Sequence, residues 1–125
     1  MAKGPVKGSG AASPGDAPAF DPVEFAELAG VIGEDAVLDL VWIFETETTD
    51  RLQRLVAGGQ DKVTLVREMH TLKGAAGIVA SPRLTALGQC LEQMALRGIA
   101  PASCDLKAIE DALRVYLEAV RIRTG

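Results

Sequence analysis

From residue 21 to the end of the chain, apolar residues recur three and four positions apart, which is the spacing of one face of an α-helix. The pattern predicts a short helix over 22–30 and four longer helices over 34–57 and about 61–79, 82–97 and 103–123. No segment alternates with the two-residue period of a strand. The apolar stripes of the four long helices are, in order, Val37, Val41, Phe44, Thr48, Leu52 and Leu55; Leu65, Met69, Leu72, Ala76 and Val79; Leu84, Leu87, Leu91 and Met94; and Leu106, Ile109, Leu113, Tyr116 and Val120.

Local start and stop signals frame these helices. Residues 21–24, Asp-Pro-Val-Glu, combine an N-cap acceptor, a proline at the first helical position and the glutamate of a capping box. Ser81 and Pro82 provide a second cap and proline, and glycines follow the predicted helices that end at 57 and 97. Four long amphipathic helices with short loops predict an all-α fold, an antiparallel four-helix bundle, with the short N-terminal helix lying across one end as a lid.

Residues 1–20 differ in composition from the rest of the chain. They hold four Gly and three Pro, and Phe20 is their only large apolar residue apart from Met1 and Val6. Such a segment cannot bury enough apolar surface to offset the entropy that ordering would cost. We therefore expect a flexible Gly/Pro-rich leader over 1–20 and one folded domain over 21–125.

Charge and composition exclude several functional classes. The chain of 125 residues has 13 Lys+Arg and 17 Asp+Glu, a net charge of −4, so it lacks the basic surface of a nucleic-acid binder. It contains no run of 18 or more apolar residues that could span a membrane. Two cysteines, Cys90 and Cys104, and one histidine cannot form a conventional structural zinc site, so we expect no bound metal. No signal-peptide pattern opens the chain, so we expect a cytoplasmic protein with free thiols.

The single histidine, His70, lies in the middle of the predicted helix 61–79. A solitary histidine in a helical protein is more often a packed or incidental residue than a functional one. However, a helix turns by about 100° per residue, so His70 points roughly 140° away from the centre of the apolar stripe. We therefore expect the ring to face solvent, where an imidazole is mostly neutral at pH 7 and is a competent nucleophile toward phosphorus.

Two glycines follow His70 at the helical spacings of four and seven residues, Gly74 and Gly77. Glycine inside a helix costs about 1 kcal/mol relative to alanine, and no helix end explains Gly74. A missing side chain permits close approach by another molecule. The two glycines therefore predict a surface cleared for a partner beside the imidazole, with packing against a neighbouring helix as the alternative.

Two cations and two polar residues complete the candidate site. Lys73, one turn after His70, and Arg67, one turn before it, could each neutralise a phosphoryl group on the ring, although most such residues are only solvated surface charges. The attacking nitrogen carries no proton, so it needs no general base. It needs an acceptor on the other ring nitrogen to fix the tautomer. Glu92 and Gln89 on the next helix are both candidates, and their spacing does not decide between them.

Residues 69–77, Met-His-Thr-Leu-Lys-Gly-Ala-Ala-Gly, followed by Leu84 and the pair Leu91 and Glu92, resemble the motif of histidine-containing phosphotransfer (HPt) domains. That motif reads H-x-L-K-G-[SA]-A-G, then a leucine on the next helix and a closing L-E or I-Q pair. The resemblance covers about residues 21–123, and the specific part lies in 63–92. The chain departs from the family pattern at Ala80, where glycine is common.

The resemblance implies a phosphotransfer intermediate rather than an ordinary enzyme. The family takes a phosphoryl group from a receiver-domain aspartate onto Nε2 of the histidine, here His70, and passes it to another receiver. It implies that Lys73 stabilises the phosphoryl group, that Gly74 admits the receiver, and that Glu92, a glutamine in several members, lies near the histidine. The receiver brings the Mg²⁺, so the domain itself needs no cofactor. Because the sequence has no Gly-rich nucleotide loop, we expect that the chain neither binds ATP nor phosphorylates itself.

The expected partners are response-regulator receiver domains, and a hybrid sensor kinase is a further candidate; the family's usual state is a monomer. The docking surface should surround His70 and include exposed apolar side chains with a polar rim. The candidates are Val63, Val66, Ile78, Trp42 and Leu38. Trp42 could instead extend the core beneath the short N-terminal helix.

Two other functions fit the same sequence. The first is an adaptor that binds receivers without accepting phosphate, against which the joint presence of His70, Lys73 and Gly74 argues. The second is the phospho-accepting domain of a larger sensor or chemotaxis-type kinase.

Overall fold

Five α-helices make up most of the computed structural model, which describes residues 13–124. They are α2 (Pro22–Ile32), α3 (Glu34–Ala57), α4 (Lys62–Ile78), α5 (Pro82–Leu96) and α6 (Ser103–Thr124), and they follow a single 3-10 turn, η1 (Pro14–Asp16). Every helix begins and ends within two residues of the bounds predicted from the sequence. The described residues contain no strand, so the all-α prediction is confirmed.

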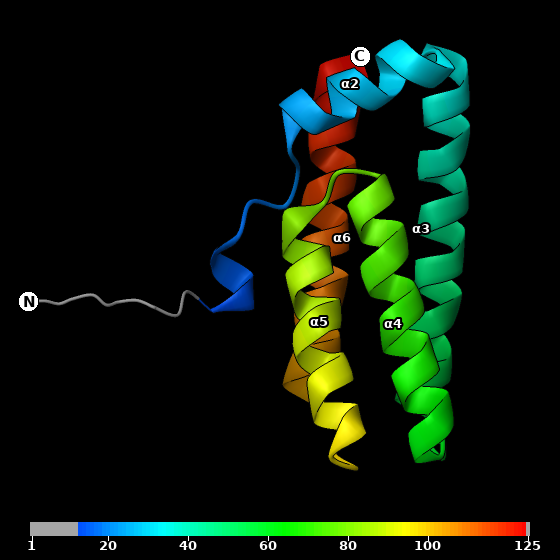
Figure 1. The fold of residues 1–125 in the computed structure, drawn as a ribbon, viewed down its shortest axis with the longest axis vertical. Helices are drawn as coiled ribbons and strands as arrows, with labels where there is room; N and C mark the ends of the chain where they lie inside the picture. Colours follow the sequence, from blue (N-terminus) through cyan, green and yellow to red (C-terminus); the bar gives the residue numbers. More distant parts are fainter. Residues whose placement is uncertain (1–12, 125) are drawn as a thin grey trace, which may run out of the picture.

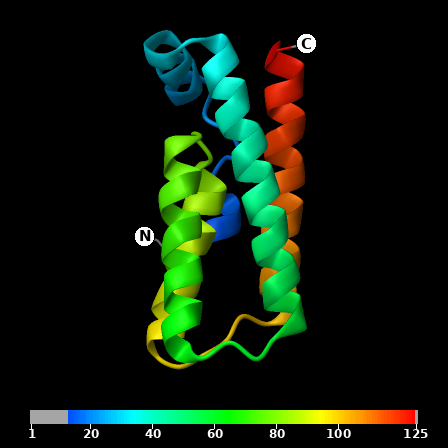
Figure 2. The same cartoon turned by 90° about the vertical axis from the view of Figure 1, so that its right-hand side faces the viewer.

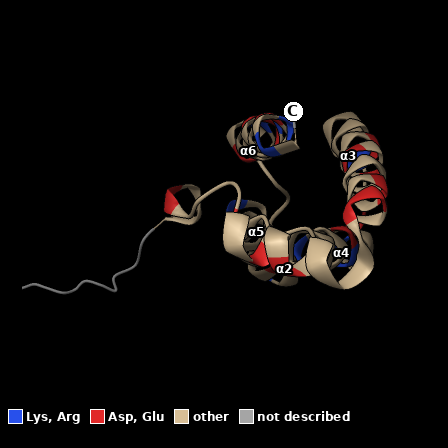
Figure 3. Ribbon diagram, turned by 90° about the horizontal axis from the view of Figure 1, so that it is seen from above, with Lys and Arg blue, Asp and Glu red and all other residues tan. Residues whose placement is uncertain are grey.

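The four long helices form the predicted antiparallel bundle (Figure 1). Each of them packs against two others, in the closed order α3, α4, α5, α6 and back to α3. Figure 2 shows the α3–α4 and α5–α6 loops together at one end of the bundle. Seen from the other end, the four helices stand at the corners of a quadrilateral and α2 crosses above α4 and α5 as a lid (Figure 3).

The sequence explains how the lid begins and how it turns into the bundle. The Asp21 side chain accepts hydrogen bonds from the backbone N–H groups of Val23 and Glu24 at 3.0 and 3.1 Å. The predicted capping box is only half formed, because the Asp21 N–H donates to the carbonyl oxygen of Ala80 instead. Gly33, at φ +96°, then lets the chain turn sharply from α2 into α3.

The core lies between the four helices and contains nearly all of the predicted apolar stripes, with only Leu52, Met94 and Leu106 half-buried. Tyr116 is fully buried at its centre, with ring edges of Phe20 and Phe44 against it at centroid distances of 5.9 Å. Its hydroxyl donates to the carbonyl oxygen of Val79 at 2.7 Å, which satisfies a buried polar group. Burial raises the pKa of Tyr116, so the phenol stays neutral and keeps its proton as a donor.

One buried ionic group was not predicted. Arg51, only 6% exposed in α3, donates through Nε to Glu68 of α4 at 3.0 Å. Arg54 donates to the same carboxylate through Nε and Nη2 at 2.9 and 3.0 Å. The hydrogen bond from Arg54 lowers the pKa of the Glu68 carboxyl most; burial opposes the shift and the Arg51 hydrogen bond adds to it. The pair of arginines therefore fixes α3 against α4 close to the middle of α4.

The expected flexible leader over 1–20 is wrong at its C-terminal end. Residues 13–20 pack on α5: the Arg83 side chain and backbone N–H donate to the carbonyls of Ala17 and Pro18 at 2.8 and 2.9 Å, and the buried Ser81 hydroxyl donates to Ala19 at 2.7 Å. Phe20 lies 5.2 Å from Phe25, centroid to centroid. Long-range contacts thus offset the entropic cost of ordering residues 13–20, although their composition alone predicted no ordered structure. The rest of the predicted leader lies outside the described residues.

The α4–α5 loop shows how the chain does without the glycine common at position 80. Ala80 adopts φ +66°, the one positive φ among the described non-glycine residues. A left-handed residue with a Cβ costs about 1–2 kcal/mol, and it is held here by its buried methyl group and by the hydrogen bond from Asp21 to its carbonyl. Ser81 then caps α5 by accepting from the Leu84 N–H.

Candidate functional site

His70 projects from the middle of α4 on the side away from the core. Its side chain is 68% exposed, whereas its neighbour Met69 is fully buried. The Nδ1 atom lies 2.9 Å from Oε2 of Glu92 on α5. The ring therefore faces solvent, as the helix periodicity predicts, and His70 is not a packed residue.

Glu92, and not Gln89, is the residue that holds the imidazole. The Glu92 residue is 8% exposed, and its second oxygen, Oε1, accepts a hydrogen bond from Nζ of Lys73 at 2.6 Å. Gln89 instead accepts from the same Nζ at 2.9 Å. Two residues of α5 thus bind two residues of α4, and the choice that the sequence left open is decided by the register of the two helices.

These contacts determine the state of the ring. The hydrogen bond from Lys73 lowers the pKa of the Glu92 carboxyl most; burial opposes the shift, and the hydrogen bond with His70 lowers the pKa further. Glu92 is therefore ionised at neutral pH and can only accept hydrogen bonds. A neutral His70 must then carry its proton on Nδ1, which leaves the lone pair of the exposed ring on Nε2. This arrangement presents a nucleophilic nitrogen to solvent.

The surface beside the ring is open at one of the two predicted glycines. A Cβ built on Gly74 would meet no atom within 4 Å, whereas one on Gly77 would lie 3.9 Å from Oγ1 of Thr85 on α5. Gly77 therefore faces a neighbouring helix, which was the alternative explanation for the two glycines. Gly74 is the one of the two that leaves uncovered space beside the ring. Arg67 is exposed, and within residues 13–124 no ion pair joins it to the cluster around His70.

The family model of the Hpt domain matches residues 39–122 of the chain. The chain belongs to the Hpt domain family. The searches of curated proteins and of solved structures returned no significant match. The match begins in the second turn of α3 and includes α4, α5 and nearly all of α6, so it covers the four-helix bundle that carries His70.

Membership of the Hpt family assigns a phosphotransfer role in two-component signalling. Hpt domains are phosphocarriers rather than enzymes, and their partners in phosphorelays are receiver domains. None of the helices described here is both long and apolar enough to cross a membrane. Within residues 13–124, no three His, Cys, Asp or Glu side chains gather as a metal site would require. Cys90 and Cys104 are exposed and free.

The predicted docking residues of this Hpt domain divide into two groups. Val63, Ile78 and Trp42 are 68%, 61% and 65% exposed, so they are available to a partner. Val66 and Leu38 are half-buried against the core, which leaves them mainly a packing role. The exposure of Trp42 also argues against its alternative interpretation as an extension of the core beneath α2.

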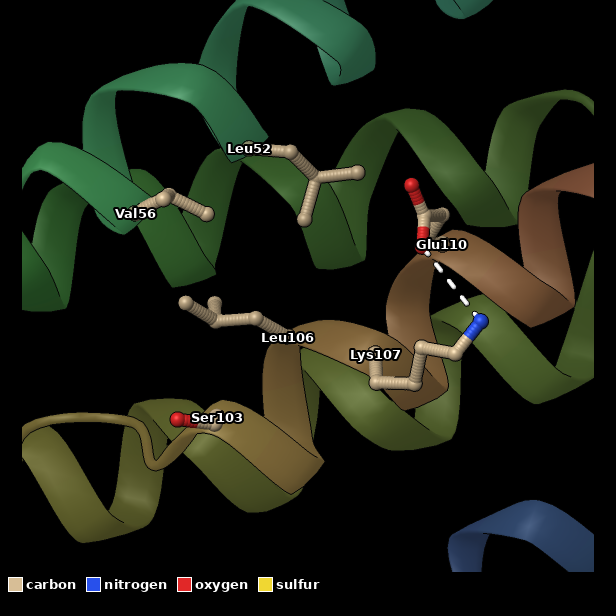
Figure 4. Close-up of a pocket in the computed structure, with 6 residues that line it drawn as sticks. All are labelled: Leu52, Val56, Ser103, Leu106, Lys107 and Glu110. Atoms are coloured by element: carbon tan, nitrogen blue, oxygen red, sulfur yellow. Dashed lines mark ion pairs between the residues drawn. The ribbon is translucent and has the colours of Figure 1, made fainter.

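A groove of about 580 Å³ runs from this site along α4 and α5 toward the start of α2. Lys73, Gly77 and Gln89 line the end near His70, and Asp21 and Glu24 line the other end. A second hollow of about 310 Å³ lies between α3 and α6 (Figure 4). Its lining is Leu52, Val56 and Leu106 together with Ser103 and an ion pair of Lys107 and Glu110 at 3.6 Å, and no histidine or cysteine lines it. The chemistry of the chain is therefore concentrated at the α4–α5 face.

The sequence analysis missed one residue of this face, Gly88 on α5. A Cβ there would lie 2.9 Å from the backbone nitrogen of Lys73. The signal that could have found it is the one used for Gly74, a glycine inside a helix with no helix end to explain it.

Proposed function

We propose that this Hpt domain accepts a phosphoryl group on Nε2 of His70 from the aspartyl phosphate of one receiver domain and passes it to the aspartate of another. One observation carries the proposal: the Nδ1 of an exposed imidazole is bound by an ionised carboxylate, 2.9 Å away, beside the open space at Gly74. That combination leaves a reactive nitrogen exposed to solvent beside a glycine that no side chain covers.

The transfer balances without a general base. The Nε2 lone pair attacks phosphorus, the bond from phosphorus to the aspartate oxygen breaks, and the aspartate leaves as a carboxylate. The ring then carries phosphorus on Nε2 and its original proton on Nδ1, so it becomes an imidazolium next to Glu92. The carboxylate stabilises this charge through a charge-assisted hydrogen bond. Attack by the next aspartate reverses every bond change.

Lys73 allows a carboxylate to occupy a position near the phosphoryl group. An unpaired Glu92 would repel the incoming negative charge, but Nζ of Lys73 lies 2.6 Å from its Oε1 and neutralises it. The ammonium is 27% exposed, so it can also turn toward the phosphoryl oxygens. Our proposal assigns the Mg²⁺ and the acidic pocket to the receiver and places no ATP site on this chain. It also places the domain in the cytoplasm, as a monomer.

Incubation with a phosphorylated receiver and Mg²⁺ tests the proposal. We expect an acid-labile mass increase of about 80 Da, the mass of one phosphoryl group replacing a proton, which is absent in His70→Gln. Incubation with ATP alone should give no increase. If several receivers bind the protein and none yields the adduct, the protein is an adaptor rather than a carrier.

A further inference from the structure

Gly88 is the one described glycine whose Cβ would press against the backbone of another helix. A Cβ on this residue would lie 2.9 Å from the backbone nitrogen, 3.0 Å from Cα and 3.1 Å from Cβ of Lys73. Two of these three atoms belong to the backbone, so no side-chain rotation could relieve the contact. The other glycines inside the described helices, Gly30, Gly74 and Gly77, have no such neighbour. Gly88 is therefore the position where a missing side chain sets the distance between two helices.

This contact lies next to the groups that bind His70. Glu92 is four residues after Gly88, so it projects from the same face of α5 one turn further along. Lys73 is three residues after His70 on α4. The approach of Gly88 to Lys73 thus brings Glu92 to both His70 and Lys73, at 2.9 and 2.6 Å.

A side chain at position 88 would change these distances. Non-bonded carbon atoms prefer separations of about 3.5–4.0 Å, so a Cβ would push the helices roughly 0.5–1 Å apart at this point. Donor–acceptor distances of N–H···O hydrogen bonds lie at about 2.7–3.2 Å, and a contact of about 3.6 Å is no longer a hydrogen bond. Glu92 holds two partners on α4 at once, so a shift of α5 changes both distances.

We infer that Gly88 is a positioning residue for phosphotransfer. Its missing side chain holds α5 at the distance from α4 where Glu92 fixes the proton of His70 on Nδ1. This inference rests on the proposed function only for its effect on transfer, since the state of the ring can be measured without phosphate.

The first test compares Gly88→Ala with Gly77→Ala by ¹⁵N NMR of the His70 side chain, at a pH where the ring is neutral. Both substitutions add one methyl group to a helical glycine that faces the other helix of the α4–α5 pair, but the methyl group at 77 meets only Thr85 Oγ1 at 3.9 Å. We expect the wild type and Gly77→Ala to show the proton on Nδ1. Gly88→Ala should shift it largely to Nε2. An unchanged tautomer in Gly88→Ala would overturn the inference, as would an equal shift in both variants.

A second variant tests whether the Glu92 side chain just reaches His70, and it leaves the contact between the helices unchanged. Glu92→Asp keeps the charge but shortens the side chain by one methylene, about 1.5 Å. We expect it to fold normally and to lose the Nδ1–H tautomer, as Gly88→Ala does. If Glu92→Asp keeps that tautomer, the interhelical distance is not limiting and the inference fails, even if Gly88→Ala does not fold.

A double-mutant cycle then tests whether Gly88 affects phosphotransfer through the position of Glu92. Gly88→Ala should slow phosphotransfer about tenfold, the effect of one lost charge-assisted hydrogen bond. The same substitution in a Glu92→Ala background should cause no further slowing, because the residue that it misplaces is already absent. A further tenfold loss in that background would contradict a role through Glu92. If no variant or wild type accepts phosphate, the proposed function fails, while the NMR result still decides the inference.

Discussion

Glu92 binds Lys73 through one carboxylate oxygen, at 2.6 Å, and His70 through the other, at 2.9 Å. The two partners have different consequences. Lys73 lowers the pKa of the Glu92 carboxyl and neutralises its charge, and the ionised carboxylate keeps the proton of His70 on Nδ1. Lys73 therefore acts on the ring through Glu92.

Lys73→Ala should slow transfer and shorten the lifetime of the phosphohistidine without unfolding the protein. Loss of the ammonium removes the largest cause of the lowered Glu92 pKa and leaves an unneutralised carboxylate near the phosphoryl group. The Glu92 pKa should rise, and it can be followed by NMR titration of its side-chain carboxyl carbon. Unchanged transfer, lifetime and titration would contradict the role of Lys73.

Gly74→Gln should abolish transfer while leaving stability nearly unchanged. The new side chain would enter open space, because a Cβ on Gly74 meets nothing beyond its own helix backbone within 4 Å, so the fold has room for it but the partner does not. The measurements are the transfer rate and a thermal unfolding curve. Exchange at the wild-type rate would show that the receiver does not approach over Gly74.

Stability should decline in acid because of Glu92 and Glu68. Both carboxyls have pKa values in the folded protein below their ordinary 4.5, chiefly through hydrogen bonds from Lys73 and Arg54. Groups with lowered pKa values stabilise the fold fully above the unfolded-state pKa, and this stabilisation is lost as the pH falls through the folded-state values. In urea unfolding, the contribution of these two carboxyls to the free energy of unfolding should be constant above about pH 5.5 and should decline below about pH 4.5. In Glu68→Gln the decline should be smaller.

Glu68→Ala should lower the free energy of unfolding by about 1–3 kcal/mol, because the largely buried Arg51 would lose its partner. Glu47→Ala on α3 is the control, since Glu47 is exposed and forms no ion pair within the described residues. Chemical unfolding of both variants measures the difference. Equal losses of unfolding free energy in the two variants would mean that the contacts of Glu68 with the two arginines do not stabilise the fold.

Phe20→Ala should destabilise the bundle by about 2 kcal/mol, although the composition of residues 1–20 suggested no packed role. The ring contacts Phe25 and Tyr116 at centroid distances of 5.2 and 5.9 Å. Val23→Ala, at a residue 66% exposed, should change stability by less than about 0.5 kcal/mol. A loss no larger than that of Val23→Ala would show that residues 13–20 add little to the fold.

The sequence by itself determined the helices, their bounds within two residues and the direction of His70. These properties follow from the 3.6-residue period and from caps such as Asp21 and Ser81, which act within one or two turns of the chain. The same local information identified Gly74, because a glycine in a helix without a helix end is unusual wherever it occurs.

Only the tertiary structure decided which residues meet across the helices. The sequence left Glu92 and Gln89 as equal candidates, since the register of α5 against α4 decides which of them reaches the ring. It also gave no reason to pair Arg51 with Glu68, to pack residues 13–20 on α5, or to place Gly88 against Lys73. Periodicity fixes the direction of a side chain from its own helix, but the distance to the next helix depends on the packing of both backbones.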